Sequence, residues 1–473
     1  MENNKITLFE EDVSKWYSDI VLKSKLVSYA PVKGTLFFSP YGFSLWNNIK
    51  KELTKRFSKL GVEEVIFPSV FPLSYLKKEE KHVEGFSPEI FLITNLGEKK
   101  LDEALVLRPT SEVLFNEYFK NVLQSYNQLP IKLNQWVSVF RAEKNTKPFL
   151  RNSEFLWQEG HTTHASKKDA EDFAFKILDL YENFLKNFLL LPLLKGKKTK
   201  RERFAGAEDT YAVETILKDG QALQVGTSHY LSNNFSKVFN VRIQGKDGKL
   251  FFPFQTSWAV STRLIGALVM SHSDNNGLIL PSKIAPYQIV ISTIFSKENN
   301  DKINDLINKL KKRISNNFNI LVDTSDKGIG FKIQNYEVMG IPLRIEIGNK
   351  ELLSKKITIT KRADKSKTNI VLSNLDSSLI KKLLLENDKL ILENANKNFN
   401  KKIKEISNID EIKKNVESGF VTKCYWEDNE EDEKRIKEKT GATIRIIKKT
   451  NLKGKAINSS NKTNIIAYFA RAY

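Results

Sequence analysis

The sequence is poor in cysteine and histidine. Its 473 residues include one cysteine, Cys424, and five histidines. One cysteine cannot form an intramolecular disulfide, and it cannot build the cysteine-rich zinc sites that stabilise many small domains. We therefore expect neither a disulfide framework nor a structural zinc ion.

Long apolar runs are also missing. The longest, such as residues 188–194 and 264–270, are far shorter than the ~20 residues that a membrane-spanning helix needs. Residues 1–11 are polar and acidic, where a secretory signal would have an apolar segment. These features predict a cytoplasmic protein with no membrane partner.

Acidic residues are outnumbered by basic ones. The chain has 76 Lys and Arg against 56 Asp and Glu, a formal net charge of +20. Such an excess fits a polyanionic partner such as RNA. A Lys- and Asn-rich composition caused by codon bias would give the same excess, so charge alone supports an RNA partner without establishing it. The length indicates two to four domains.

The most informative segment is residues 137–166, VSVFRAEKNTKPFLRNSEFLWQEGHTTHAS. It predicts two strands joined by a polar, Pro-containing connection. Because strand side chains alternate, the first strand should place Val139, Arg141 and Glu143 on one face. The second should likewise place on one face Phe155, Trp157, Glu159 and His161.

Charged and aromatic side chains on one face have two interpretations. The hairpin could be amphipathic with a solvated side. Alternatively, it could bind a ligand, with Arg141 contacting a phosphate or carboxylate and Glu143 or Glu159 contacting an amine. Periodicity alone leaves both open.

The amino-acid sequence of the segment is more specific than its periodicity. FRAE, PFLR and EFLWQEGHTTHA together resemble motif 2 of class II aminoacyl-tRNA synthetases. WQEGH resembles prolyl-tRNA synthetases of the archaeal and eukaryotic-like type. The other segments that are similar to this family follow in the expected order: motif 1 (a helix over 42–60, then a strand over 62–71), HVEGF (82–86), RPTSE (108–112), ERFAGA (202–207), QVGTSH (224–229) and motif 3 (255–281).

Several of these segments also have a plain structural interpretation. Thr110 or Ser111 could simply cap the helix expected over residues 112–123. Residues 82–86 are expected to begin a loop that covers the substrate, although His82 by itself would be read as a surface histidine.

The resemblance implies a set of site residues. Three of them, Arg141, Glu143 and Arg263, would be catalytic. The proline site would consist of Thr110, Glu112, Arg141, Trp157, Glu159, Phe204 and His229. The ATP site would consist of Arg141, Glu143, Arg151, Gln224, Thr227, Ser261 and Arg263. Mg²⁺ would accompany ATP, and no protein metal ligands are expected.

The resemblance also implies an α+β architecture. Residues 1–283 would form the catalytic domain, an antiparallel sheet flanked by helices. Residues 284–369 would form an α/β anticodon-binding domain. Residues 370–473 would form a small α+β domain that has lost the zinc ligands of its relatives and ends with Tyr473 near the catalytic domain. A homodimer built through motif 1 is expected.

The implied function is the ATP-dependent activation of L-proline to prolyl-adenylate and its transfer to tRNA(Pro). Arg141 and Arg263 are separated by 122 positions (263 − 141), which leaves no room for the large editing insertion of bacterial-type enzymes. Three alternatives remain: a threonyl, histidyl or glycyl synthetase, a non-catalytic RNA-binding relative, and a metalloenzyme that uses His161 and His164. Two histidines without a further His or Cys cluster make a poor metal site, so both are expected to shape the wall of the pocket instead.

Overall fold

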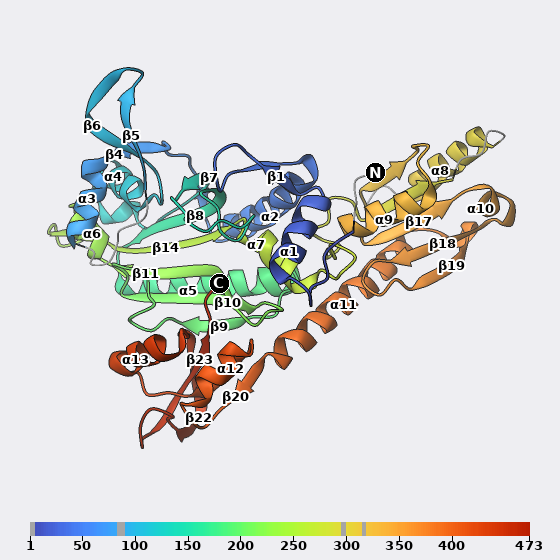
Figure 1. Cartoon of the computed structure of the whole chain (residues 1–473). Coiled ribbons are helices and arrows are strands. Elements are labelled where there is room, and N and C mark those ends of the chain that lie inside the picture. The colour runs from blue at the N-terminus through green and yellow to red at the C-terminus, as the bar shows by residue number, and fades with distance from the viewer. Residues whose placement is uncertain (1–4, 83–89, 295–298, 315–317) are drawn as a thin grey trace.

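The computed structural model describes residues 5–82, 90–294, 299–314 and 318–473. Its centre is an eleven-stranded sheet with the order β20-β21-β23-β22-β9-β10-β11-β14-β8-β7-β3 (Figure 1). Neighbours from β9 to β7 pair antiparallel, and the short β3 pairs parallel with β7. The strands are β3 (Glu63–Glu64), β7 (Ile131–Phe140), β8 (Glu154–His164), β9 (Leu194–Lys197), β10 (Asp209–Ile216), β11 (Ala222–Ser232), β14 (Phe254–Ser261), β20 (Ile403–Glu405), β21 (Val421–Tyr425), β22 (Thr443–Lys455) and β23 (Lys462–Ala470).

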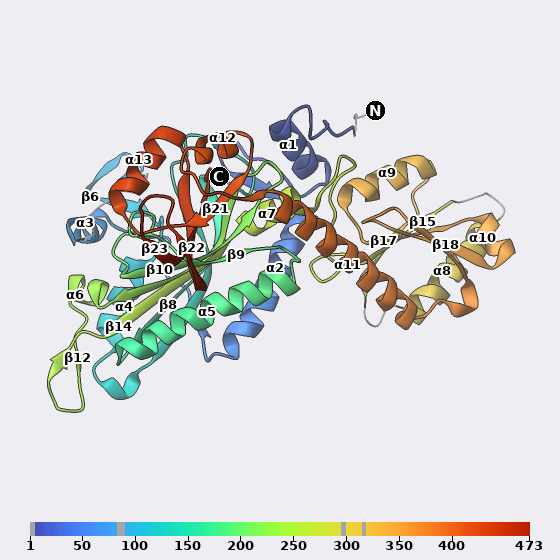
Figure 2. The ribbon, with the colours of Figure 1, turned by 90° about the horizontal axis from the view of Figure 1, so that it is seen from below.

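Helix α5 (Lys167–Asn187) lies along one face of this sheet (Figure 2). Ser166 caps its first turn by accepting a hydrogen bond from the Asp169 backbone N–H. Its apolar stripe is buried in the largest hydrophobic core, as its helical spacing predicts. The same core includes residues of α1 (Val13–Lys23), α2 (Pro40–Ser58) and α7 (Arg263–His272).

A smaller three-stranded sheet with the order β4-β6-β5 stands beside the main one. The β5–β6 hairpin extends away from the body of the molecule (Figure 1). The elements of this region are β4 (Val70–Pro72), β5 (Phe91–Leu96), β6 (Lys99–Leu107), α3 (Leu73–His82), α4 (Glu112–Val122) and α6 (Asn234–Val238), and two strand pairs lie elsewhere: β1 (Val27–Tyr29) with β2 (Leu36–Phe38), and β12 (Ile243–Gln244) with β13 (Leu250–Phe251).

One strand was predicted over residues 62–71, and this prediction is wrong. The segment is divided between β3 and β4, which belong to different sheets. Pro68 lacks the N–H that a continuous strand would need, and the Phe67 N–H bonds the Gln135 side chain instead of a strand partner. The predicted substrate-covering loop at 82–86 lies, apart from the backbone of His82, outside the described residues.

A separate five-stranded sheet has the order β16-β15-β17-β18-β19, with β15, β16 and β17 parallel. Its elements are β15 (Ile289–Thr293), α8 (Asn300–Ile314), β16 (Ile320–Asp323), α9 (Ile329–Met339), β17 (Leu343–Ile347), α10 (Asn349–Ser354), β18 (Lys356–Lys361) and β19 (Lys367–Val371). The domain boundary expected between residues 369 and 370 falls inside β19.

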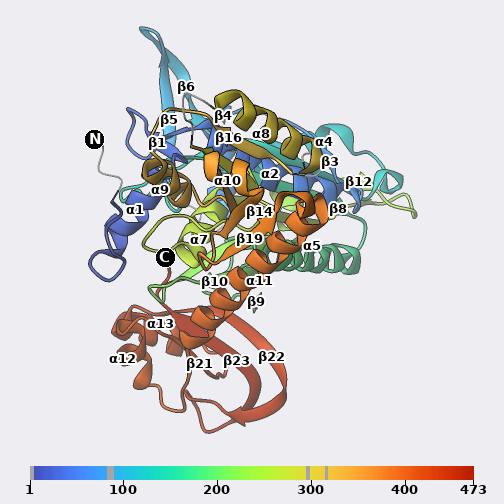
Figure 3. The same cartoon turned by 90° about the vertical axis from the view of Figure 1, so that its right-hand side faces the viewer.

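The 25-residue helix α11 (Ser377–Lys401) connects this domain to the last part of the chain (Figures 1 and 3). That part contains α12 (Glu411–Glu417), α13 (Glu430–Thr440) and β20 to β23. Its strands extend the main sheet, because Ile447 of β22 pairs with Lys197 of β9. The predicted location of Tyr473 is confirmed: its N–H donates to the Ala222 carbonyl of β11 at 3.1 Å. Among the described residues, no helix has the length and apolarity to cross a membrane.

Candidate active site

One face of β8, β14 and β11 forms the floor of a cavity of about 760 Å³. Trp157, Glu159 and His161 of β8 line it, and they pair with Ser261, Ala259 and Ser257 of β14, which line it too. The shared face predicted for the β8 side chains is therefore confirmed. Gln158 points the other way, and its side chain is hydrogen-bonded to the Tyr181 hydroxyl of α5 at 2.6 Å.

Arg141 and Glu143 line the cavity from outside the strand in which they were predicted. Strand β7 ends at Phe140, so the prediction that both belong to it is wrong. Arg141 still donates its backbone N–H to the Ser153 carbonyl at 2.8 Å, but the Ser153 N–H donates to the Gly34 carbonyl instead of back across the hairpin, and the regular ladder ends there. The two side chains are placed by an irregular connection instead of by strand alternation.

Arg141, Arg151 and Arg263 all line the cavity. Arg141 lies between the other two and the buried carboxylates of Glu112 and Glu159. Arg141 lies over the Trp157 ring at 5.4 Å and donates Nε–H to the Pro109 carbonyl at 3.1 Å. Arg263, the first residue of α7, donates its Nε–H to the Leu150 carbonyl at 3.3 Å. Burial, followed by repulsion from Arg141 and Arg151, lowers the pKa of Arg263 to about 10. Arg151 contacts the Glu143 carboxylate at 4.0 Å. The part of the cavity near Arg151 and Arg263 has an excess of positive charge that suits an anionic ligand.

Two buried carboxylates and an imidazole occupy a second position in the cavity. One ligand atom each from Glu112, Glu159 and His161 lies within 4.8 Å of the others, so the group could hold a cation. Burial, and then the nearby Glu159, raise the pKa of Glu112 above the ordinary carboxyl range. The Thr110 hydroxyl donates to the Glu112 carboxylate. Thr110 therefore does not cap α4, and Ser111, although it stands at the N-cap position, makes no side-chain capping bond.

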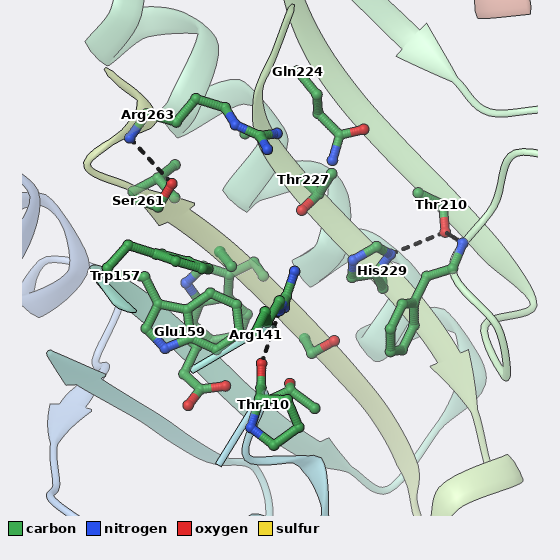
Figure 4. Close-up of a pocket in the computed structure, with 18 of the residues that line it drawn as sticks. Thr110, Arg141, Trp157, Glu159, Thr210, Gln224, Thr227, His229, Ser261 and Arg263 are labelled. Atoms are coloured by element: carbon green, nitrogen blue, oxygen red, sulfur yellow. Dashed lines mark hydrogen bonds between the residues drawn. The ribbon is translucent and has the colours of Figure 1, made fainter. Parts of the chain in front are cut away.

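The wall beside this group is apolar. The Phe204 and His229 rings are 4.8 Å apart, and His229 Nδ1 hydrogen-bonds the Thr210 hydroxyl at 2.9 Å. Burial, with a smaller effect of His161, lowers the pKa of His229 to about 3, so the ring is neutral. In Figure 4, Gln224, Thr227 and Arg263 lie toward one end of the cavity, and Thr110 and Glu159 lie toward the other, with Arg141 near Trp157. All of the predicted site residues line this one cavity.

Sequence reasoning missed several residues that shape the site. Gln135 of β7 donates to the Glu159 carboxylate at 2.7 Å and to Ser111 Oγ at 2.8 Å. Thr210 faces His229 across the β10–β11 pair. A buried polar residue in an apolar strand was a usable signal for Gln135. Thr210 carried no comparable signal, because its partner is set by strand register.

The two histidines of the metalloenzyme alternative point to opposite faces of β8. His161 lines the cavity, whereas His164 bonds the Thr162 hydroxyl at 2.7 Å and packs against Phe173 of α5. Strand residues three apart alternate in this way, so the two rings cannot share one ion. The expectation that both histidines shape the pocket wall is correct for His161 and wrong for His164.

Comparisons with known proteins decide the family. Three family models match: "tRNA synthetase class II core domain (G, H, P, S and T)" over residues 94–272, "Anticodon binding domain" over 288–383 and "Prolyl-tRNA synthetase, C-terminal" over 409–473. The proline--tRNA ligase of Mycoplasma capricolum subsp. capricolum is 46% identical, over 99% of each chain. That of Ureaplasma parvum serovar 3 is 43% identical, also over 99% of each.

The chain belongs to the prolyl-tRNA synthetase family. It is accordingly a proline--tRNA ligase of the class II fold, and the predicted α+β fold class is confirmed. The crystal structure of prolyl-tRNA synthetase from Cryptosporidium parvum, complexed with halofuginone and AMPPNP, is similar, with a TM-score of 0.93 and 31% identity over 99% of this chain and 97% of that one. The alternatives of a different synthetase, a non-catalytic relative and a metalloenzyme are set aside.

Proposed function

We propose that the cavity binds ATP and proline together and converts them to prolyl-adenylate before proline is transferred to tRNA(Pro). The observation that carries this proposal is the separation of charge within one cavity. Arg151 and Arg263 lie toward one end, two buried carboxylates lie toward the other, and Arg141 lies between them, where the charges of Glu112 and Glu159 act on it. This distribution suits a triphosphate beside an amino acid whose amino group is cationic. The AMPPNP in the solved relative, an ATP analogue, supports the same assignment.

In this proposal, the secondary ammonium of proline donates to the carboxylates of Glu112 and Glu159. The Thr110 hydroxyl, already bonded to Glu112, completes this set of polar contacts. The pyrrolidine ring packs between Trp157, Phe204 and the neutral ring of His229. Gln135 and the Ser111 N–H hold Glu159 in place, so the carboxylate does not need to reorganise when the ligand binds.

Arg141 would act at the reacting atoms. The proline carboxylate attacks the α-phosphorus of ATP, a C–O–P linkage forms and pyrophosphate leaves with the electron pair of the broken P–O bond. Arg141 is held by Pro109 and by the Trp157 ring, so its guanidinium can contact the carboxylate and the α-phosphate together. Arg263 would contact the γ-phosphate. The remaining predicted ATP contacts are those of Glu143, Arg151, Gln224, Thr227 and Ser261.

Mg²⁺ would enter with ATP as part of the substrate. The carboxylate of Glu143 could contact this ion, because it lies beside Arg151 in the cavity and its side chain is 35% exposed. The ion would supply positive charge to the phosphates.

The family's zinc site does not fit the residues of the C-terminal domain. Cys424 is buried, burial raises its pKa to about 12, and its Sγ–H points to the Ala467 carbonyl at 3.9 Å. The loops after β21 and before β23 are instead joined by side-chain hydrogen bonds, since Asn458 and Asn461 both donate to Glu427. We propose that this domain folds without zinc, and one equivalent of bound zinc in purified protein would contradict that.

Three further proposals rest on family membership. The chain forms a homodimer through motif 1, where Ile66 is 80% exposed and available for contact; a monomer in sedimentation analysis would contradict this. It acts in the cytoplasm, which fractionation of the source cell would test.

The enzyme also lacks editing in cis, because the residues between Arg141 and Arg263 build the catalytic sheet and its covering helices. Rapid hydrolysis of alanyl-tRNA(Pro) by the purified enzyme would refute the last proposal.

Proline-dependent ATP–pyrophosphate exchange tests the central proposal. We expect exchange with proline and much weaker exchange with threonine, histidine, glycine, alanine or cysteine. Arg141→Ala and Arg263→Ala should each abolish it. Exchange that survives both substitutions would overturn the assigned roles, and exchange with another amino acid alone would overturn the assigned pocket.

A further inference from the structure

We propose that the C-terminal domain sets the position of one wall of the proline pocket, with Glu433 and Arg445 as positioning residues. The inference rests on the proposed function of the cavity. It concerns the pocket loop, residues 198–208, which runs between β9 and β10 without regular secondary structure. Four residues of this loop line the cavity: Glu202, Arg203, Phe204 and Ala205.

The start of the pocket loop is held by α13. Thr199, which is fully buried, donates its hydroxyl hydrogen to Glu433 Oε1 at 2.8 Å. Glu433 is itself only 3% exposed. Two internal backbone hydrogen bonds support the loop, from the Glu202 N–H to Thr199 and from the Ala207 N–H to Phe204. The Thr199–Glu433 contact therefore fixes the end from which the loop enters the cavity.

The next anchor is Arg445 of β22. Its guanidinium makes two hydrogen bonds of 2.9 Å to the buried Glu214 carboxylate of β10. It also lies 3.7 Å from Glu202, a residue of the cavity lining. Lys198, the first residue of the loop, bonds both the Glu214 carboxylate and the Arg445 carbonyl. The C-terminal domain thus contacts the loop through a buried ionic group rather than through a loose surface contact.

The opposite end of the loop reaches the predicted proline contacts. The Phe204 N–H donates to the Thr210 hydroxyl at 3.0 Å, and that hydroxyl also bonds His229. A shift at Thr199 or Glu202 would therefore move the Phe204 ring relative to His229. Because an apolar pocket separates similar small amino acids by fit, such a shift would weaken proline binding.

A buried carboxyl group such as that of Glu433 is unfavourable for the free energy of folding unless it has partners. Its Oε2 is buried and has no hydrogen-bond partner among the described residues. Burial, together with the nearby Glu202 and Asp428, raises the pKa of Glu433 to about 7 despite the hydrogen bond from Thr199 and the charge of Arg201. A buried carboxyl group in such surroundings adds little to folding, but it fixes the direction of the Thr199 side chain.

Three variants of α13 separate this proposal from a structural role. Glu433→Ala removes the acceptor, and Glu433→Gln keeps an oxygen that can accept from Thr199. Glu430→Ala is the matched control, because Glu430 contacts Lys200 of the same loop at 3.5 Å with both side chains more than half exposed. The readouts are KM for proline, KM for ATP and kcat in ATP–pyrophosphate exchange.

Glu433→Ala should raise KM for proline about tenfold, the effect of losing roughly one hydrogen bond to a charged group, and leave KM for ATP within about twofold. Glu433→Gln and Glu430→Ala should remain close to the wild-type enzyme. Thr199→Val removes the same contact from the loop side and should also raise KM for proline. It provides the test if Glu433→Ala fails to fold.

An unchanged KM for proline in Glu433→Ala or Thr199→Val would overturn the positioning role, as would an equal rise in both KM values. These results presuppose a wild-type enzyme that exchanges with proline. Failure of the wild-type enzyme itself would instead count against the proposed function, so the two failures are distinguishable.

Discussion

Asp274 and Arg362 form a two-pronged ion pair between the catalytic and anticodon-binding domains, with N–O distances of 2.9 and 2.6 Å. Asp274 lies just beyond α7, the helix that begins with Arg263, and Arg362 directly follows β18. The Arg362 side chain is 4% exposed, and its Nε–H also donates to the Glu337 carbonyl. The pair therefore fixes the anticodon-binding domain to the helix that carries a predicted ATP contact.

Asp274→Asn should destabilise the protein by about 1–3 kcal/mol, because it leaves the buried Arg362 guanidinium with a weaker partner. Urea unfolding measures the change. Lys389→Ala is the control, since it breaks an exposed pair with Glu393 on α11 and should cost less than about 0.5 kcal/mol. Equal losses in the two variants would contradict the importance of the buried pair.

The same pair predicts a dependence of stability on pH. Burial alone would raise the pKa of Asp274, but hydrogen bonding and the charge of Arg362 keep it below the ordinary value. A lowered pKa stabilises the folded state above the unfolded pKa of ~4 and loses that effect as the pH falls below it. Asp274→Asn should therefore flatten this part of the stability profile. A parallel profile would show that other groups cause it.

Gln135→Leu should raise KM for proline about tenfold or more with a smaller effect on KM for ATP. The substitution keeps the volume of the side chain but removes its hydrogen bonds to Glu159 and Ser111. Gln158→Leu is the matched control, because Gln158 is equally buried and hydrogen-bonded but faces α5. Amino-acid-dependent exchange kinetics measure both, and a proline effect of the same size in Gln158→Leu would contradict the role of Gln135.

Proline binding should weaken as the pH falls, at a pH above the usual titration of a glutamate. The pKa of Glu112 is raised by burial and by Glu159, so this carboxyl takes up a proton earlier than a free one and then cannot balance an ammonium group. The pH profile of kcat/KM for proline measures the effect. KM for ATP should stay constant over the same range, because Arg263 remains charged with its pKa of about 10. A proline profile that falls only near ~4 would contradict the prediction.

Arg263→Lys should raise KM for ATP or lower kcat, with a combined loss of about a hundredfold in kcat/KM for ATP. Lysine keeps the positive charge but loses the planar set of donors that binds two oxygens together. Arg203→Lys is the control, because Arg203 also lines the cavity but lies on the pocket loop and bonds the Glu208 carbonyl. Exchange kinetics at varied ATP test the pair. A similar loss in both variants would contradict a specific role for Arg263, because both substitutions keep the charge and remove a guanidinium group.

Local sequence patterns predicted most of the parts correctly. The alternation in residues 155–161 identified which β8 side chains face the cavity, and the apolar stripe of α5 identified its buried face. The pattern failed at Arg141 and Glu143, because a strand ends where its hydrogen bonds find other partners, and the partner of Ser153 is the distant Gly34. It failed in the same way at residues 62–71, where Gln135 takes the Phe67 N–H.

The sequence by itself determined the order of the motifs, the identity of the family and the residue types that surround the cavity. The family follows from the resemblance of short segments such as WQEGH and RPTSE to known synthetases, and the order and residue types are read directly from the chain. The tertiary structure alone decided that Gln135 holds Glu159, that Thr210 faces His229 and that α13 of the C-terminal domain holds Thr199. The first two contacts join neighbouring strands whose residues are 24 and 19 positions apart, and the third joins residues 234 positions apart. Strand register and domain packing set them, and neither leaves a periodic signal in the sequence.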